Sequence, residues 1–204
     1  MSLSKGDSVS VVIGSDEELA EDLDFTWTAT KSADSVKITP ATDSYGASIA
    51  VVKAPAGGKV VKVPISVVNV QSGKKVTFSI MIGNEVESVE GLSSAIAVSS
   101  AAEDKVEKTL DYKFVCADSS AGTTDKIKAF VTSELEAGSG YDLSNNKFKL
   151  SAKASAASIA YKNGTFTLKV KKGTENGTQV RVLVVATHAD RTVDVFEGGV
   201  ITIG

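Results

Sequence analysis

Short runs of alternating apolar and polar residues dominate this sequence of 204 residues. Val, Ile, Thr and Phe recur at every second position over strand-length segments, which Gly, Asn or Ser interrupts. This period of two is typical of β-strands with one buried face, and β-branched residues discourage long helices. Strands at such short intervals predict an all-β sandwich or barrel. The expected strands are residues 8–13, 25–29, 36–39, 48–52, 60–70, 76–82, 110–116, 127–132, 147–150, 158–161, 165–170, 180–186, 192–196 and 200–203.

Two Asn-Gly pairs, at residues 163–164 and 176–177, each separate two expected strands. Asn-Gly readily adopts the positive φ angles of a type I′ hairpin turn, so both pairs predict tight turns. Each pair is followed by Thr and is therefore also a formal glycosylation acceptor. We favour the turn interpretation because no secretory signal precedes them.

Six features occur twice in the same order along the chain and indicate an internal repeat. From them we expect an internal duplication into two tandem immunoglobulin-like antiparallel β-sandwiches, residues 1–99 and 104–204, joined by a small polar linker at 99–103. The aligned segments are residues 37–39 with 149–151, 47–50 with 157–160, 55–58 with 163–164, 63–67 with 166–170, 76–82 with 180–186, and 86–91 with 193–198, while Gly73 is matched with Gly177.

Alternation also predicts which side chains fill the two interiors. In the first module Val63, Ile65 and Val67 share one strand face, and Trp27 is a natural core residue between Phe25 and Ala29. Its counterpart in the second module is either Phe130 or Val131, depending on a one-residue choice of register. In the second module we expect the buried face to carry Phe166, Leu168 and Val170.

The chain resembles bacterial immunoglobulin-like (Big-type) domains. The resemblance rests on cysteine-poor tandem modules, on the opening strand Val-Val-Ile-Gly at residues 11–14 and on the closing strand Val-Ile-Thr-Ile at residues 200–203. Such domains occur in bacterial surface adhesins and on tailed-phage virions as capsid-decorating, tail or fibre-associated modules. The resemblance implies binding or structural roles and carries no functional residues onto this sequence.

Charge and hydropathy narrow the function classes. Lys and Arg number 22 against 25 Asp and Glu, so the net charge of −3 lacks the basic excess of a nucleic-acid-binding protein. No apolar run approaches the ~18 residues of a membrane span. Met1 is not followed by the apolar region of a signal peptide, so we expect synthesis without Sec export, with a mature fragment as the alternative.

Residues 16–24 form the densest acidic run, and Ser15 with Glu18 resembles a capping box that predicts one or two helical turns over residues 17–23. The acids lack the alternating spacing and the glycine turn of a calcium loop. We therefore interpret them as a solvated loop or helical turn.

His188 and Cys116 are the chain's only His and Cys, too few ligands for a His/Cys zinc site. His188 lies near Asp190 and Arg191, but no Gly-x-Ser-x-Gly elbow supplies a nucleophile, so we favour a structural or surface histidine over a catalytic base. Cys116 follows Phe114 in an alternating segment and is expected to be a small buried residue.

Cofactor and nucleic-acid signals are also weak. The sequence contains neither Gly-x-x-x-x-Gly-Lys-Ser/Thr nor Gly-x-Gly-x-x-Gly, the two glycine-rich patterns that bind phosphate groups. The basic residues Lys169, Lys171 and Lys172 have no interleaved aromatic residues, which a nucleic-acid-binding surface would be expected to have. We therefore expect no catalytic, cofactor-binding or metal-binding residues and no enzyme activity.

The first functional hypothesis is a capsid auxiliary or decoration protein of a tailed phage, made in the host cytoplasm and assembled onto the virion. Its partners would be other virion proteins, chiefly the major capsid protein, with copies of itself and host surface glycans as further candidates. The alternatives are a bacterial cell-surface adhesin or surface-layer module and a phage tail component. An enzyme built on a β-sandwich would need two carboxylates facing each other in a cleft, which sequence alone cannot test.

Overall fold

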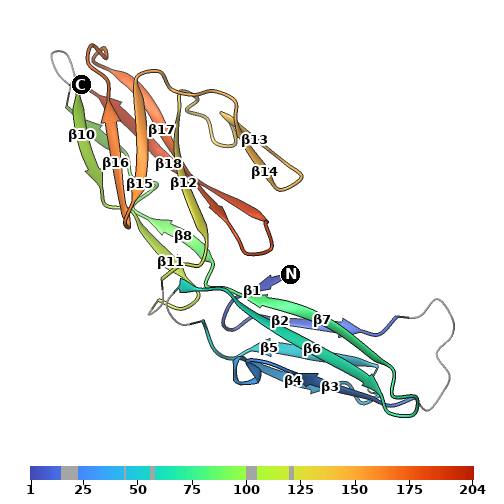
Figure 1. Cartoon of the computed structure of the whole chain (residues 1–204). Helices are drawn as coiled ribbons and strands as arrows, with labels where there is room; N and C mark the ends of the chain where they lie inside the picture. Colours follow the sequence, from blue (N-terminus) through green and yellow to red (C-terminus); the bar gives the residue numbers. More distant parts are fainter. Residues whose placement is uncertain (15–22, 44, 56–57, 100–104, 120–121) are drawn as a thin grey trace. The chain divides into compact units, whose positions relative to one another are not determined.

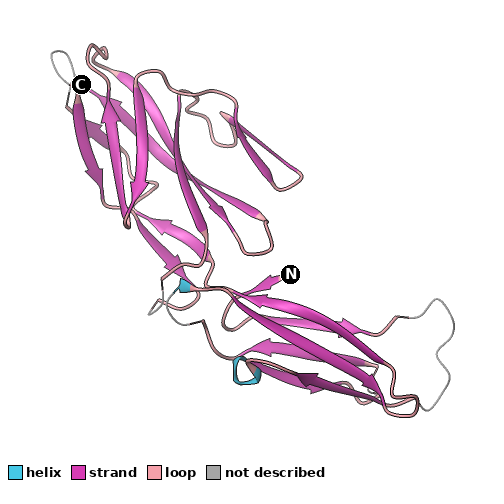
Figure 2. Ribbon diagram, in the orientation of Figure 1, coloured by secondary structure: helices cyan, strands magenta, loops and turns pink. Residues whose placement is uncertain are grey.

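The computed structural model describes residues 1–14, 23–43, 45–55, 58–99, 105–119 and 122–204. The described residues form β-strands and, at Ala33–Ser35, the single-turn 3-10 helix η1, which Figure 2 draws in cyan. The described part of the chain contains no helix that is long and apolar enough to cross a membrane. The chain divides into unit 1, Met1–Glu85 with Cys116–Thr124, and unit 2, Val86–Val115 with Asp125–Gly204.

The boundary between the units differs from the expected division after residue 99 in two ways: the chain enters unit 2 already at Val86, and the later segment Cys116–Thr124 belongs to unit 1. Asn84, which is fully buried, donates hydrogen bonds from its side chain to the carbonyl oxygens of Asp118 (3.0 Å) and Gly122 (3.3 Å). Its Oδ1 accepts a bond from the Asp118 amide at 3.0 Å. These bonds fix Cys116–Thr124 on unit 1. Of the expected linker, only Ser99 lies within the described residues.

Unit 1 is a sandwich of two sheets, labelled in Figure 1. One sheet has the order β1 (Ser2–Leu3), β7 (Lys75–Ile82), β6 (Val61–Asn69) and β3 (Phe25–Ala29). The other has the order β2 (Ser8–Val12), β5 (Gly46–Val51) and β4 (Val36–Pro40).

The interior of unit 1 follows the predicted strand parity. Val63, Ile65 and Val67 are at most 5% exposed, which confirms that this face of β6 points inward. Trp27 and Ile49 belong to the same apolar core, so the core is built from both sheets, as burial of one face of each sheet requires.

Unit 2 repeats this architecture with two additions. Its larger sheet has the order β12 (Lys126–Thr132), β17 (Thr178–Thr187), β18 (Val193–Ile203) and β9 (Ile96–Val98). Its smaller sheet has the order β10 (Val106–Leu110), β16 (Thr165–Val170) and β15 (Ala157–Lys162). The additions are the pair β8 (Val86–Glu90) with β11 (Lys113–Cys116) and the hairpin β13 (Tyr141–Ser144) with β14 (Lys147–Leu150).

Both units have the strand order of an immunoglobulin-like sandwich, which confirms the expected fold class. They are not wholly antiparallel. β1 runs parallel to β7, and β9 runs parallel to β18, each over two or three residues.

The sequence alignment behind the expected duplication is wrong, because it pairs non-equivalent strands. Residues 47–50 lie in β5, the central strand of its sheet, whereas residues 157–160 lie in β15, an edge strand. Gly73 lies between β6 and β7, whereas Gly177 lies between β16 and β17. The alignment has slipped by one strand, which alternating Val- and Ser-rich segments permit because they resemble one another.

The two Asn-Gly pairs behave differently. Asn163 and Gly164 both have positive φ, 50° and 79°, and connect β15 to β16 in the two-residue hairpin that the sequence predicts. At the second pair only Gly177 has positive φ, and the chain passes there from β16 in one sheet to β17 in the other. The second pair is therefore not a hairpin turn.

Phe166, Leu168 and Val170 are at most 1% exposed, which confirms the predicted buried face of β16.

The place of Trp27 is taken in unit 2 by a residue that the sequence analysis did not consider. Trp27 pairs with Val67 on β6. The residue of β17 equivalent to Val67 is Val184, which pairs with Ala129 on β12. Ala129 therefore takes the place of Trp27. Val131 is buried two residues further along, and Phe130 has the opposite parity. Neither expected candidate is therefore the counterpart of Trp27.

Candidate functional site

A groove opens on one side of unit 1, between β2 and β7. Its volume is about 540 Å³, within the range of pockets that hold ligands. Asn69, Ser72 and Lys74 contribute polar atoms to its wall. The apolar wall includes Val11 and Val12 from β2, Phe25 and Trp27 from β3, and Val76 and Phe78 from β7.

The groove exists because two edge strands meet on this side. β2 is the last strand of its sheet, and β7 is covered by β1 only at Met81 and Ile82. Among the described strands, none pairs with the rest of this edge of β7 or with the outer edge of β2. Val76 pairs with the buried Val67 and so lies on the inner face, yet it is 67% exposed. Val12 is 72% exposed.

Trp27 closes the inner end of the groove. Its side chain is 7% exposed, and its ring meets Phe78 edge-on with the centroids 6.4 Å apart. The expectation that Trp27 is a core residue is confirmed, but it also lines the groove. Because the chain has one tryptophan, its fluorescence reports on this site.

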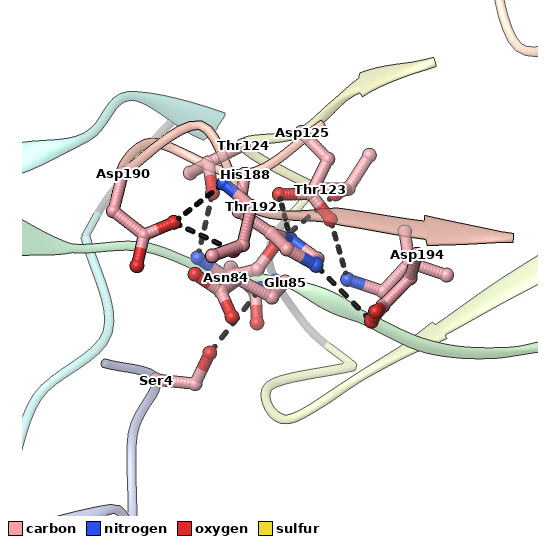
Figure 3. A network of polar contacts seen from close by, with 11 residues as sticks. Ser4, Asn84, Glu85, Thr123, Thr124, Asp125, His188, Asp190, Thr192 and Asp194 are labelled. Carbon is pink, nitrogen blue, oxygen red and sulfur yellow. Dashed lines mark hydrogen bonds and ion pairs between the residues drawn. The ribbon is translucent and has the colours of Figure 1, made fainter. Parts of the chain in front are cut away.

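In unit 2, His188 lies between two carboxylates, as Figure 3 shows. Its Nδ1 is 3.0 Å from Asp125 Oδ1, and its Nε2 is 3.1 Å from Asp194 Oδ2. Both ring nitrogens therefore face carboxylate oxygens, and each N–H that the ring carries has a carboxylate acceptor. The other Asp125 oxygen accepts a bond from the Val86 amide at 2.8 Å. His188 is 8% exposed, so it is a buried residue rather than a surface one.

The turn after His188 is fixed by Asp190. Its Oδ1 accepts hydrogen bonds from the amide and the hydroxyl of Thr192, at 3.0 and 2.6 Å. The residue between them, Arg191, has a φ of 74°, a left-handed conformation that is uncommon for a residue with a long side chain. Asp190 thus holds the connection from β17 to β18.

A buried cation, Arg181, lies on the outer side of β17. Its Nη1 donates to Glu197 Oε2 at 3.0 Å, and its Nη2 donates to the Ser139 carbonyl at 3.1 Å. Glu197 also accepts bonds from the Tyr141 hydroxyl (2.8 Å) and the Gly138 amide (2.9 Å). Burial and the hydrogen bond to Glu197 raise the pKa of Tyr141. The ion pair therefore anchors the segment before hairpin β13–β14 on the larger sheet.

A second groove, of about 710 Å³, lies between hairpin β13–β14 and the outer face of β12, β17 and β18. Phe130 contacts Phe148 with a ring separation of 4.8 Å, and both line the groove. Lys128, Asn146 and Arg191 add hydrogen-bond donors. The outward orientation of Phe130 is thus explained by the hairpin that covers it.

The remaining sequence candidates do not converge on either groove. Cys116 is buried, as expected, at the end of β11. Lys169 pairs with Glu107 at 3.0 Å and lowers the pKa of that carboxyl. Lys171 and Lys172 are exposed. Of the acidic run and expected helix at residues 16–24, only residues 23 and 24 lie within the described residues.

Both grooves, Arg181 and the partners of His188 escaped the sequence analysis. His188 and Asp125 are 63 residues apart, so no local motif joins them. The unpaired edge of β7 depends on where strand pairing ends, which periodicity does not reveal. An exposed apolar residue on an inward face, such as Val76, becomes recognisable only once its partner strand is known.

No family model and no curated protein matches the sequence. Among solved structures, the titin I-band fragment I67-I69 matches 100% of this chain at 11% identity with a TM-score of 0.38. The titin domains A168-A170 match 100% of it at 9% identity and a TM-score of 0.35. Domains 4 and 5 of the S-layer protein SbsC match 92% of it at 12% identity and a TM-score of 0.32, over 74% of their own length. The chain spans 62% of either titin fragment.

Proposed function

We propose that this protein is a non-catalytic structural or surface module that docks on a larger protein assembly through the groove of unit 1. The observation that carries the proposal is the apolar opening between β2 and β7, flanked by two edge strands. Exposed apolar surface beside free backbone edges is the surface that proteins use to bind one another.

The polar side chains of unit 2 support a non-catalytic role. Both ring nitrogens of the buried His188 are engaged by carboxylates of the same unit, Asp125 and Asp194. Arg181 and Glu197 hold an inserted segment in place. These groups, which would otherwise be the candidates for acid–base chemistry, are used by contacts within the fold.

The specific assembly that we propose is the capsid of a tailed phage, with the major capsid protein as partner and the host cytoplasm as the place of synthesis. The resemblance to the Ig-like modules of virions and bacterial surface proteins supports it. Mass spectrometry of purified virions, compared with a surface-protein preparation of the producing cells, tests it. Stoichiometric abundance in virions is the expected result, and abundance only at the cell surface would contradict the capsid assignment.

The groove itself is tested by one pair of variants. Val76→Glu places a carboxylate on its wall and is expected to abolish incorporation into the assembly. Val52→Glu changes another exposed valine of unit 1, 49% exposed and outside the groove, and is expected to leave incorporation unchanged. Equal incorporation of both variants would show that docking uses another surface.

Host surface glycans form a second partner class, favoured by the groove of unit 2. Aromatic rings beside a few hydrogen-bond donors are typical of small-ligand sites, and Phe148, Lys128 and Arg191 supply both. Glycan-array binding that is lost in Arg191→Ala would support this role. An array signal that Arg191→Ala leaves unchanged, or no signal, would contradict it.

A further inference from the structure

The shared strand order allows the two units to be compared position by position. The parallel pairs Leu3–Ile82 in unit 1 and Val98–Ile203 in unit 2 occupy the same place in the two sheets. Ile80 lies two residues before Ile82, and Ile201 lies two residues before Ile203, so these two isoleucines are equivalent. Both are fully buried. The flank of β7 before Met81 therefore corresponds to the flank of β18 before Thr202.

In unit 2 this flank is covered by the unit's own chain. Residues 91–98 run beside β18, first through a hydrogen bond from the Gly199 amide to the Leu92 carbonyl at 2.8 Å, then through the parallel pairing of β9. Leu92 is 3% exposed and belongs to the core. A Cβ on Gly199 would come within 2.5 Å of the Ser93 oxygen, so glycine is needed for this close approach.

In unit 1 the equivalent flank carries the groove. The parallel ladder of β1 and β7 begins at Ser2 and Met81. Upstream of Met81, Phe78 and Val76 line the groove. β18 has a bulge between its pairings with Arg181 and Leu183, whereas β7 pairs regularly with β6, so Phe78 stands where β18 has Gly198 and Gly199. In a regular strand the side chains point to the two faces of the sheet, so Phe78 leaves the edge of β7 open to a further strand. The place that Leu92 fills in unit 2 therefore lies beside the groove in unit 1.

We propose that the groove of unit 1 accepts a β-strand donated by a different protein. The strand would run parallel to β7, extend the β1–β7 ladder upstream of Met81 and insert a large aliphatic side chain between β2 and β7. The added strand would form hydrogen bonds with the backbone N–H and C=O groups at the edge of β7, and it would bury the side chains of Val76 and Phe78. This inference deepens the proposed docking function and rests on it for the existence of a partner.

A second copy of this chain is a poor donor. The segment that has the required form, residues 91–98, is already seated in unit 2, with Leu92 in the core and β9 in the larger sheet. Donating it would unfold part of the donor's own sandwich. The donor is therefore a strand of another protein.

The test uses the full chain and a synthetic peptide with the sequence of residues 88–95, which carries Leu92 but omits β9. Saturable quenching or shifting of Trp27 fluorescence is expected, with NMR shift changes confined to the amides around Val11, Val76 and Phe78. The matched peptide with Leu92→Asp is expected to bind at least about tenfold more weakly, because burial of a leucine side chain is lost. Equal binding of the two peptides, no saturable response, or shift changes elsewhere would overturn the proposal.

A covalent version keeps the test informative if the free peptide binds weakly. Residues 88–95 are fused directly before Met1, so that the added strand continues β1 and Leu92 keeps its spacing from the paired residues. Unfolding of unit 1 is measured by Trp27 fluorescence. We expect the fusion that carries Leu92 to have a higher unfolding midpoint than the same fusion with Leu92→Ala. Equal midpoints would count against strand insertion.

Two further outcomes separate this inference from the proposed function. If Val76→Glu abolishes incorporation into the assembly while neither the peptide nor the fusion has an effect, docking stands and strand addition fails. If the unmodified chain self-associates through the groove in sedimentation experiments, and Val76→Glu prevents it, the donor is a second copy and the assignment to another protein is overturned.

Discussion

Arg181 and Glu197 form a buried ion pair on the outer side of the larger sheet of unit 2. Their side chains are 4% and 22% exposed, and the Nη1–Oε2 distance is 3.0 Å. Removing one partner of such a pair leaves the other as a buried charge without compensation, which is more damaging than removing both.

Glu197→Ala is therefore expected to lower the free energy of unfolding by roughly 3–5 kcal/mol, measured by urea denaturation. It also removes the acceptor of the Gly138 amide, so the segment before β13 should become sensitive to protease. The double variant Arg181→Met/Glu197→Ala should recover much of the loss. A double variant that is less stable than Glu197→Ala would contradict this account, and exposed Glu90→Ala is the control.

The two carboxylates beside His188 are expected to differ in importance. The Asp125 side chain is fully buried, whereas the Asp194 side chain is 59% exposed. His188→Leu removes the ring that the buried Asp125 carboxylate contacts and should destabilise the protein by roughly 3–5 kcal/mol, while Asp194→Asn should have an effect of at most about 1 kcal/mol. Urea denaturation measures both effects. Equal destabilisation by the two variants would contradict this difference.

The buried face of β16 offers a direct test of the core. Leu168 is fully buried, and Leu168→Ala is expected to lower the free energy of unfolding by ~2–5 kcal/mol because it leaves a cavity. Leu143→Ala, at a leucine 44% exposed on hairpin β13–β14, should change it by less than about 0.5 kcal/mol. Similar effects for both leucines would show that β16 does not carry the core.

Much of the fold follows from period-two alternation, because that signal is local. It predicts the inward faces of β6 and β16 and most of the strands, since a buried face fixes strand parity. It misses β1 and β9, whose two or three residues are too short to show a period. It also misses β8 and β13, and of β10 it includes only Leu110, which it assigns to the same strand as β11.

Strand equivalence and the candidate sites depend on long-range pairing. Residues 47–50 and 157–160 have the same sequence, Ala-Ser-Ile-Ala, yet one segment is flanked by two strands and the other by one. The groove arises from the edge that β1 leaves uncovered on β7, and the His188 cluster joins three segments of unit 2. Such features depend on which strands become neighbours, and local residue patterns carry little information about that choice.

Tyr112 is expected to make the stability of unit 2 fall at alkaline pH. Its ring is 6% exposed and meets Phe166 edge-on at 5.4 Å, and among the described residues none hydrogen-bonds to its hydroxyl. Burial raises the pKa of Tyr112 from 10.0 to about 12, because the phenolate would lose its hydration. Since the folded pKa is the higher one, the unfolded chain loses this proton first as the pH rises.

The contribution of the buried phenol is thus complete below pH 10.0 and is lost progressively as the pH approaches about 12. Urea denaturation from pH 9 upward should show a decline that is smaller in Tyr112→Phe, which keeps the ring and removes the titrating hydroxyl. Absorbance at 295 nm should show that the same variant lacks the component titrating near pH 12. If Tyr112→Phe and the parent chain decline in parallel, the alkaline loss of stability comes from other groups and the phenol is not buried as described.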